Sequence, residues 1–394
     1  MRTPLLSLSF LLVSSTVFGQ NCPTAALSPA NNHFAFDVYT ILNQKKGPVF
    51  YSPYSIFTAL QMTADGAKGT TAAEMLQILH STDNIECIQH DIRNTQQQYN
   101  LLQATGDSIQ TANSLWVENS FPLNPSYLNQ AKDMYNASIK GVNFIKSFEQ
   151  SRKTINSWVG EQTEQRIKEL LPGGTITSYT RLVLVNTIWL KAKWLTAFRQ
   201  ENTRDSTFYA PGAELTVPFM NNTLVTNYAE DENMQVIELP YSSNKLSMIV
   251  MLPAKDKEHE FSKIFNLEQA TKWIGSMRQK RTQVSLPKFK LTASFTLNDV
   301  LKTLGMKTAF SDVADFSGIS NQGLHISDVV HKAFIEVDEA GTEAAAATAV
   351  TVVTRSLVTP PKIEKIFNAD HPFIFFLYDK ENKTILFMGK IEKP

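Results

Sequence analysis

The segment with the most unusual composition reads Glu339-Ala-Gly-Thr-Glu-Ala-Ala-Ala-Ala-Thr348 and continues as Ala-Val-Thr-Val-Val-Thr-Arg-Ser-Leu-Val-Thr-Pro-Pro361. Its alanine run favours a helix, because alanine has the highest helix propensity. The β-branched threonines and valines that follow oppose a helix, since such side chains favour pleated structure. A flexible linker is a second alternative, but the segment lacks the Gly/Ser composition of a linker and separates no domains.

We interpret this segment as a chain with two possible states, either exposed or inserted as a strand into an existing sheet. Small side chains lower the steric barrier to sliding between strands. On a period of two, one face of the inserted strand would bury Thr342, Ala344, Ala346, Thr348 and Val350. Arg355 is the only basic side chain between Lys332 and Lys362, and the final two prolines stop any regular element there.

Outside this segment the chain has the composition of an ordinary globular protein. Of its 394 residues 43% are hydrophobic, and its 37 basic and 37 acidic side chains cancel. A zero net charge argues against nucleic acid or an anionic membrane as the main partner. Two cysteines cannot form a disulfide scaffold, so stability has to come from a large packed core. Helical patterns come first and strand patterns later, with no linker between them, which indicates one α+β domain.

The N-terminus has the three regions of a secretory signal peptide. Met1-Arg2 supplies the positive start, an apolar stretch runs from Leu5 to Phe18, and cleavage is expected after Gly19. We therefore expect residues 1–19 to be a signal peptide and residues 20–394 to form a soluble, secreted, extracellular protein. No later apolar run approaches the roughly 18 residues that a membrane span needs.

Secretion bears on the two cysteines and on N-linked sugars. In an oxidising compartment Cys22 and Cys87 can form a bridge that tethers the N-terminal tail. Alternatively, Cys87 is a small buried hydrophobe and Cys22 a free or mixed-disulfide thiol. The Asn-x-Ser/Thr pattern predicts glycosylation at Asn136, Asn221 and Asn382, the last in what looks like a tight hairpin turn.

Local patterns place several helices and strands. Ser52-Pro53 predicts a helix start with a hydroxyl cap, and the segment from Thr71 to Glu74 has the pattern of a capping box. Leu182 to Leu190 is a nearly continuous apolar run, typical of a strand buried on both faces. The segment over 284–291 reads as a further strand, and that over 373–391 as a closing hairpin.

The usual motifs for catalysis are missing. Gly318-Ile-Ser320 lacks the final glycine of a nucleophile elbow, and His259-Glu260 has Lys263 where a zinc-protease helix needs its second histidine. The chain contains no P-loop and no dinucleotide fingerprint, and its seven histidines are dispersed. We therefore expect neither an enzyme nor a metal site.

The segment from Glu339 to Thr348 closely resembles the hinge of inhibitory serpins, and the resemblance extends from about Asn32 to Pro394. It is carried by motifs in a fixed order: Phe50-Tyr-Ser-Pro-Tyr-Ser-Ile56, Gly66-Ala-Lys-Gly-Thr-Thr-Ala-Ala-Glu74, Thr154-Ile-Asn-Ser-Trp-Val159, Leu182-Val-Leu-Val-Asn186, Lys193-Trp194, Val330-His-Lys-Ala333, His371-Pro-Phe373 and Leu386-Phe-Met-Gly389. The resemblance implies the serpin fold, a single large α+β domain with about three β-sheets, about eight to nine helices and an exposed reactive-centre loop at about 339–361.

The resemblance also implies a mechanism. Counting from the hinge glycine as the family does places the scissile bond at Arg355-Ser356, and arginine there fits trypsin-like serine proteases, whose specificity pocket carries a carboxylate. Attack would give a covalent 1:1 complex with a monomeric inhibitor, followed by insertion of the loop into the main sheet. The hinge residues are Glu339, Gly341, Thr342, Glu343, Ala344, Ala345, Ala346, Ala347 and Thr348. Their small side chains match inhibitory members; the alternative is a non-inhibitory carrier or storage protein on the same scaffold.

Further positions match structural roles in the family. The polar cluster beneath the opening sheet, called the shutter, would consist of Ser52, Ser55, Asn186 and His331. Trp194 matches the aromatic residue where the loop first enters, a region called the breach. Lys288 and Glu339 resemble the ion pair near that point.

A possible cofactor site lies between Thr271 and Lys290, a span without any acidic residue. A heparin-like glycosaminoglycan could bind there, as it does to comparable segments of some secreted serpins, through Lys272, Arg278, Lys280 and Arg281. The alternative is a solvated face with Lys288 used internally. No other cofactor is implied.

Overall fold

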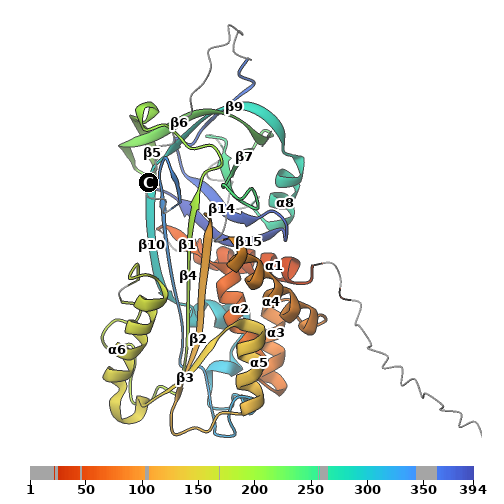
Figure 1. Cartoon of the computed structure of the whole chain (residues 1–394), viewed down its shortest axis with the longest axis vertical. Helices are drawn as coiled ribbons and strands as arrows, with labels where there is room; N and C mark the ends of the chain where they lie inside the picture. Colours follow the sequence, from red (N-terminus) through yellow and green to blue (C-terminus); the bar gives the residue numbers. More distant parts are fainter. Residues whose placement is uncertain are drawn as a thin grey trace, which may run out of the picture.

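The computed structural model describes residue 22 and residues 25–44, 47–102, 106–167, 169–255, 257, 265–342 and 362–394, and every structural statement below refers to these residues. The predicted signal peptide, the hinge residues from Glu343 onward and the bond Arg355-Ser356 lie outside them. The described chain forms two β-sheet networks with helices packed around them (Figure 1).

The described residues form eight α-helices, and six of them precede residue 182, where the apolar strand predicted from the sequence begins. They are α1 (Leu27–Leu42), α2 (Pro53–Ala64), α3 (Gly69–Ile78), α4 (Ile85–Leu102), α5 (Pro125–Tyr135), α6 (Phe144–Gln162), α8 (Leu267–Ser276) and α9 (Asn298–Leu304). As predicted, α2 begins at Ser52-Pro53, where the Ser52 hydroxyl oxygen accepts a hydrogen bond from the Ser55 amide. Short 3-10 turns occupy Gln200–Asn202 and Thr308–Phe310.

The first network is a six-stranded sheet. Its strands, in spatial order, are β10 (Phe289–Thr296), β11 (Asp328–Val337), β12 (Gly341–Thr342), β4 (Leu182–Lys193), β2 (Ser108–Glu118) and β3 (Ser138–Val142). β4 contains the predicted apolar run and is buried on both faces, because α2 packs against one face and α6 against the other. Figure 1 shows α6 on one side of this sheet and α2 on the other.

The second network has nine strands in two parts, which the long strand β6 joins. One part contains β1 (Val49–Tyr51), β15 (Thr384–Ile391), β14 (Phe373–Asp379), β8 (Leu246–Pro253) and β7 (Met234–Pro240), and the other contains β5 (Arg204–Ala210), β6 (Ala213–Glu230), β9 (Arg278–Pro287) and β13 (Lys365–Asn368). β6 pairs with β7 only through residues 228–230, and with β5 and β9 over the rest of its length. With these two parts counted separately, the molecule has the three sheets and the single α+β domain that we expected from the sequence.

Two local predictions are wrong. The segment from Thr71 to Glu74 is not a capping box, because α3 already begins at Gly69 and the Glu74 carboxylate accepts the amides of Lys307 and Thr308 instead. The strand predicted over 284–291 is two strands, β9 and β10. Between them, at residue 288, the chain leaves one sheet network and enters the other.

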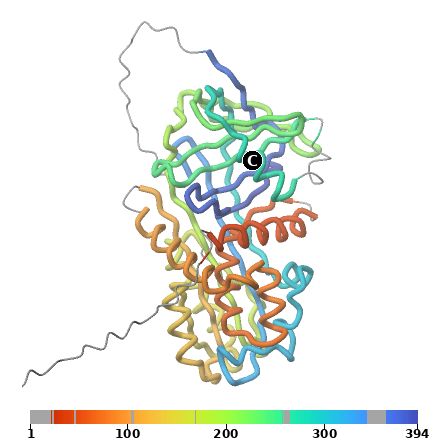
Figure 2. The backbone as a smooth tube through the Cα atoms, turned by 90° about the vertical axis from the view of Figure 1, so that its right-hand side faces the viewer, coloured from red at the N-terminus to blue at the C-terminus, as the bar shows by residue number. Residues whose placement is uncertain are grey.

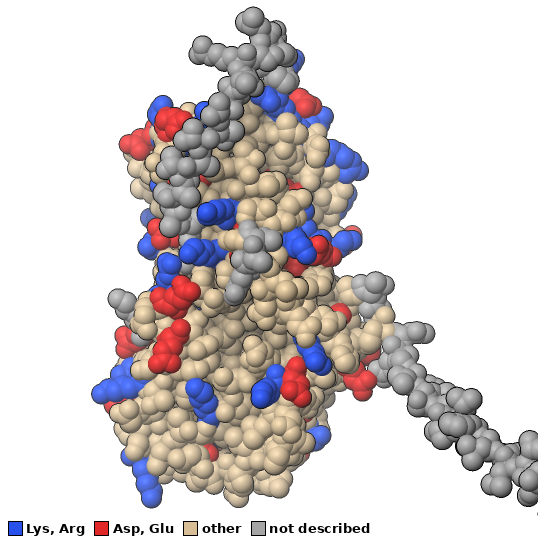
Figure 3. Space-filling model, in the orientation of Figure 1, with Lys and Arg blue, Asp and Glu red and all other residues tan. Residues whose placement is uncertain are grey.

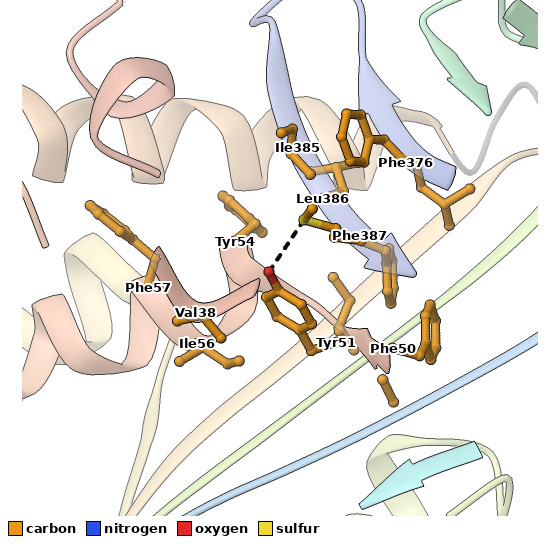
Figure 4. Packing of buried hydrophobic residues seen from close by; sticks show 14 of the residues in the cluster. Val38, Phe50, Tyr51, Tyr54, Ile56, Phe57, Phe376, Ile385, Leu386 and Phe387 are labelled. Carbon is orange, nitrogen blue, oxygen red and sulfur yellow. Dashed lines mark hydrogen bonds between the residues drawn. The ribbon is translucent and has the colours of Figure 1, made fainter. Parts of the chain in front are cut away.

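The main core fills the space between the first helices and the β14–β15 hairpin. Phe50 stacks on Phe387 with ring centroids 5.6 Å apart (Figure 4). Tyr51 donates a hydrogen bond to the carbonyl oxygen of Ala35, so β1 is tied to α1. In the rotated view α1 crosses between the upper strands and the lower helices (Figure 2). This packing holds α2 beneath β4 and positions the polar cluster described below.

Candidate functional site

β4 and β11 are neighbours in the sheet but are paired over only part of their length. Their parallel pairing runs from Val183 opposite Asp328 to Ile188 opposite Ala333 and ends there. Beyond that point, residues 189–191 of β4 and 334–336 of β11 have no partner strand on the facing edge within the described chain. The sheet therefore has an opening whose backbone donors and acceptors can pair with another strand.

The start of the hinge already occupies the mouth of this opening. Thr342 of β12 pairs with Val337 on β11 and with Ala192 on β4, and Gly341 pairs with the next residue of β4. Position 341 requires glycine, because a Cβ there would lie 2.1 Å from the carbonyl oxygen of Ala192. The first two residues of the predicted inserting strand are thus part of the sheet.

Thr342 shows which face of an inserted strand would be buried. The residue is 1% exposed, and its hydroxyl oxygen lies 2.7 Å from that of Tyr241. Its neighbours in the sheet, Ala192 and Val337, belong to the same hydrophobic core as α2. For this residue the face predicted from the period of two is confirmed.

Trp194 lies next to β12, against the turn that joins β11 to β12. Its ring stacks on Tyr241, with centroids 4.7 Å apart and planes 7° from parallel. The indole Nε1–H donates to the carbonyl oxygen of Asp338, and the backbone N–H donates to that of Ala340. Trp194 therefore lies against the turn at which the hinge begins. Nothing in the sequence marks Tyr241, which links Trp194 to Thr342.

Lys288 and Glu339 form an ion pair beside the same turn. The Lys288 ammonium is 2.8 Å from Oε2 of Glu339, and Oε1 accepts a hydrogen bond of 2.7 Å from the Thr203 hydroxyl. The Glu339 side chain is 8% exposed and that of Lys288 is 37% exposed. Burial acts to raise the pKa of Glu339, but the hydrogen bonds from Lys288 and Thr203 outweigh it and hold the pKa below its ordinary value. The pair ties the turn after β11 to the residue that joins the two sheet networks.

The four residues of the expected shutter lie in one hydrogen-bonded cluster beneath the sheet. The Ser52 amide donates to Nε2 of His331 at 3.1 Å. The side-chain nitrogen Nδ2 of Asn186 donates to the backbone carbonyl oxygen of Ser55 at 2.7 Å. Oδ1 of Asn186 lies 2.9 Å from Nδ1 of His331. Asn113 also hydrogen-bonds to Asn186, directly opposite it in the β2–β4 pair. Asn113 has no sequence signal, because only the strand register brings it into the cluster.

The hydrogen bonds of His331 define its tautomer. Because Nε2 accepts the Ser52 amide, Nδ1 carries the hydrogen and donates to Asn186. Burial lowers the pKa of His331 to about 3, so the ring is neutral at physiological pH. His331 and Asn186 are opposite each other in the β4–β11 pair. A strand that enters between β4 and β11 this far must therefore break their contact.

The basic stretch that the sequence offered as a possible polyanion site has an acidic neighbour in three dimensions. Lys280 lies 2.9 Å from the carboxylate of Glu364, which also accepts the Arg281 amide. Glu364 directly precedes β13, far from positions 271–290 in the sequence, so the absence of acidic residues from that span did not reveal it. Lys272 and Arg278 are exposed. The face of the molecule in Figure 3 carries basic and acidic side chains close together.

A disulfide joins Cys22 to Cys87 of α4. Of the three sequon asparagines, Asn136 is exposed and ends α5. Asn221 lies in the paired strand β6, and its side-chain amide nitrogen donates to the backbone carbonyls of Asn202 and Phe219. Asn382 lies in the β14–β15 turn, and its side-chain amide nitrogen donates to the side chains of Gln98 on α4 and Asp379 at the end of β14. Asn136 is the exposed member of the three, and Asn221 and Asn382 are half-buried.

None of the helices that the structure describes is both long and apolar enough to cross a membrane.

Comparison with known proteins identifies the family. Residues 29–394 match the family model described as Serpin (serine protease inhibitor). The chain is 43% identical over 371 residues to an uncharacterized serpin-like protein of Thermococcus kodakarensis, covering 93% of this chain and 85% of that protein. It is 38% identical over 380 residues to a leukocyte elastase inhibitor of Xenopus tropicalis, covering 93% and 99%.

A solved structure has the same architecture. Uncleaved ovalbumin matches with a TM-score of 0.84 at 30% identity, and the match covers 93% of this chain and 100% of ovalbumin. The family model, these relatives and the sheet topology agree over nearly the whole described chain. The protein belongs to the serpin family.

Proposed function

We propose that this chain is a secreted suicide inhibitor of trypsin-like serine proteases, which traps its target at Arg355-Ser356. The observation that carries the proposal is the opening between β4 and β11 with Thr342 already paired at its mouth. An opening beside a hinge of small side chains can accept that hinge as a new strand. A closed sheet or a bulky hinge would favour the alternative, a non-inhibitory carrier or storage protein.

The register of β12 indicates where each hinge residue would arrive. Continued along β4 and β11, it brings Ala344 between Leu190 and Ile335, both buried on the core face. It brings Thr348 between Asn186 and His331, in place of the contact that these two now make. The even-numbered residues from 342 to 348 are all alanine or threonine, small enough for the buried face.

The first chemical steps belong to the protease. Its serine attacks the carbonyl carbon of Arg355, the bond to Ser356 breaks, and the new amine leaves with a proton from the catalytic histidine. Cleavage detaches the hinge from the segment that leads to β13, and insertion then carries the ester along the sheet. From Thr342 to Arg355, a strand that rises ~3.3 Å per residue moves the ester by about 40 Å. Such a displacement would distort the protease before water hydrolyses the ester.

Arginine at the reactive bond selects the class of target. Its planar guanidinium forms a bidentate pair with the carboxylate of a trypsin-like specificity pocket. The signal peptide would direct secretion, so the inhibitor would meet extracellular proteases. It would act as a monomer. A glycosaminoglycan cofactor would bind through the exposed members of the basic cluster, Lys272 and Arg278.

Incubation with trypsin tests the proposal. The wild-type protein should form a 1:1 complex that survives boiling in detergent. Arg355→Ala should abolish trapping of trypsin, whereas Arg93→Ala, a charge removal at an exposed position of α4, should leave it unchanged. Cleavage of the wild-type protein by trypsin without any trapped complex would refute the inhibitor and favour the carrier or storage protein.

A further inference from the structure

A second group of chemically active side chains lies outside the site described above, where α1 meets the end of α3. It consists of His33, Asp37 and His80. His33 and Asp37 are four residues apart on α1, so both project from the same face of the helix. His80 follows α3 with a φ of +51°, and its ring reaches the Asp37 carboxylate. The fold thus brings together two histidines that are far apart in the sequence.

His80 contacts both of the other side chains. Nε2 of His80 lies 2.7 Å from Oδ2 of Asp37, and the imidazole rings of His33 and His80 have centroids 5.1 Å apart. Two imidazoles bound tetrahedrally to one zinc ion, with Zn–N bonds of about 2.0 Å, have ring centres about 5 Å apart. In the described chain no three such donors already converge on one point, so the His33 ring has to rotate toward the other two. His33 is exposed, so this rotation meets little steric resistance.

We propose that His33, Asp37 and His80 form a surface site for a divalent transition-metal ion of the zinc type. Two imidazoles and one carboxylate suit Zn²⁺, Cu²⁺ and Ni²⁺, with water completing the coordination. Ca²⁺ and Mg²⁺ prefer oxygen ligands alone and are poor candidates. The sequence predicted no metal site because its histidines are dispersed, and only the contact between α1 and the end of α3 brings these two together.

The contact between Asp37 and His80 has a simpler explanation, a hydrogen bond that joins α3 to α1. That explanation makes no use of His33, whose ring lies against His80 at the exposed edge of the group. His33→Ala therefore separates the two interpretations, since it removes a metal ligand and leaves the Asp37–His80 hydrogen bond in place. Alanine also favours the helix at this exposed position, so the variant should fold.

Titration of the untagged, metal-free mature protein with ZnCl2 in a calorimeter tests the site. We expect one zinc ion per chain and a loss of affinity of roughly tenfold or more in His33→Ala, Asp37→Asn and His80→Asn. Asparagine is chosen at position 80 because it tolerates a positive φ. The control is His90→Ala, an exposed histidine of α4, which should bind zinc as the wild type does. CaCl2 should give no binding heat.

Cobalt(II) gives a second readout, because the visible absorption of bound Co²⁺ reports nitrogen and oxygen coordination. Its spectrum should appear on addition of CoCl2 to the wild type and should be lost in His33→Ala. Absence of zinc uptake by the wild type would overturn the proposal. Zinc binding by His33→Ala with wild-type affinity would also overturn it and leave Asp37 and His80 with a structural role alone.

Discussion

Nδ1 of His331 lies 2.9 Å from Oδ1 of Asn186, and the two residues face each other across the paired part of β4 and β11. The Asn186 amide also donates to the carbonyl oxygen of Ser55 on α2, so this contact ties both strands to the helix beneath them. It lies inside the paired part, two residues beyond Ile188 and Ala333, where the opening ends. Trp194 and Glu339 lie at the other end of the opening, its mouth. A strand that enters fully has to replace this contact with new ones.

His331 should remain a neutral Nδ1–H tautomer throughout the physiological pH range. Burial lowers its pKa in the folded state to about 3, against an ordinary value of 6.5 in the unfolded chain. The unfolded state therefore binds a proton first as the pH falls. His331 therefore contributes its full share to the free energy of unfolding above about pH 6.5, and this share decreases as the pH falls toward 3. Between pH 7.5 and 4.5 the decrease is about 3 kcal/mol. Nitrogen-15 NMR should show the same neutral ring at pH 7.5 and 5, and an imidazolium at pH 5 would disprove this.

Asp65, at the end of α2, should affect stability in the opposite direction. Burial raises its pKa from 3.8 to about 6, despite a hydrogen bond of 2.6 Å from the Tyr135 hydroxyl. The folded state keeps a proton that the unfolded state has lost, so this residue's contribution to stability falls as the pH rises from about 4 to 6. Asp65→Asn should raise the free energy of unfolding by up to about 3 kcal/mol at pH 7.5 and by much less at pH 4. Urea unfolding at the two pH values measures the difference, and an equal effect at both would contradict it.

Lys288→Ala should destabilise the native protein more than its neighbour Lys290→Ala. The partner of Lys288, Glu339, has a side chain only 8% exposed, whereas Glu336, the partner of Lys290, is 45% exposed. Removal of Lys288 leaves a nearly buried carboxylate without its cation, at a cost of about 1–2 kcal/mol, compared with ~0.5 kcal/mol for the exposed pair. The midpoint of urea unfolding measures both variants against the wild type, and equal midpoints would show that the Lys288–Glu339 pair adds no more stability than the exposed Lys290–Glu336 pair.

Ala344→Glu should convert the inhibitor into a substrate, whereas Ala345→Glu should preserve most of the trapping. In the continued register Ala344 faces the core between Leu190 and Ile335, where an unpaired carboxylate costs several kcal/mol, roughly 3 or more. Ala345 would face the opposite side of the sheet, between the buried Trp189 and the partly buried Phe334, away from the core that Leu190 and Ile335 share. The fraction of trypsin trapped, measured on denaturing gels, should separate the two variants. Equal trapping would show that the strand does not insert in the register of Thr342.

The features that could be predicted from the sequence are those with an unusual local pattern. The hinge has its alanine run, α2 has a serine cap with proline at its first turn, and β4 has an uninterrupted apolar run. The shutter residues came from motifs that resemble a family, because no local pattern joins Asn186 to His331. Tyr241 and Asn113 could not be predicted at all. Their roles depend on which residues the strand register places opposite each other.

Contacts between distant segments also explain the predictions that the structure corrects. Glu74 has the spacing of a capping box, but the segment at Lys307 offers its carboxylate two backbone amides in another part of the fold. Glu364 supplies the acidic partner that the basic stretch lacks in sequence. His33 and His80 are dispersed in the chain and yet in contact. In each case tertiary packing brings the two partners together, and the local sequence around either partner does not show this contact.

After cleavage the hinge should enter the sheet as a strand between β4 and β11, and the melting temperature tests this most directly. The loop is cut within 343–361 by a metalloprotease, which forms no acyl-enzyme, and the cut and intact proteins are melted side by side. Insertion pairs the free edges at 189–191 and 334–336 and buries the even-numbered hinge residues, so the cut protein should melt well above the intact one. A cut protein that melts at or below the temperature of the intact protein would contradict insertion.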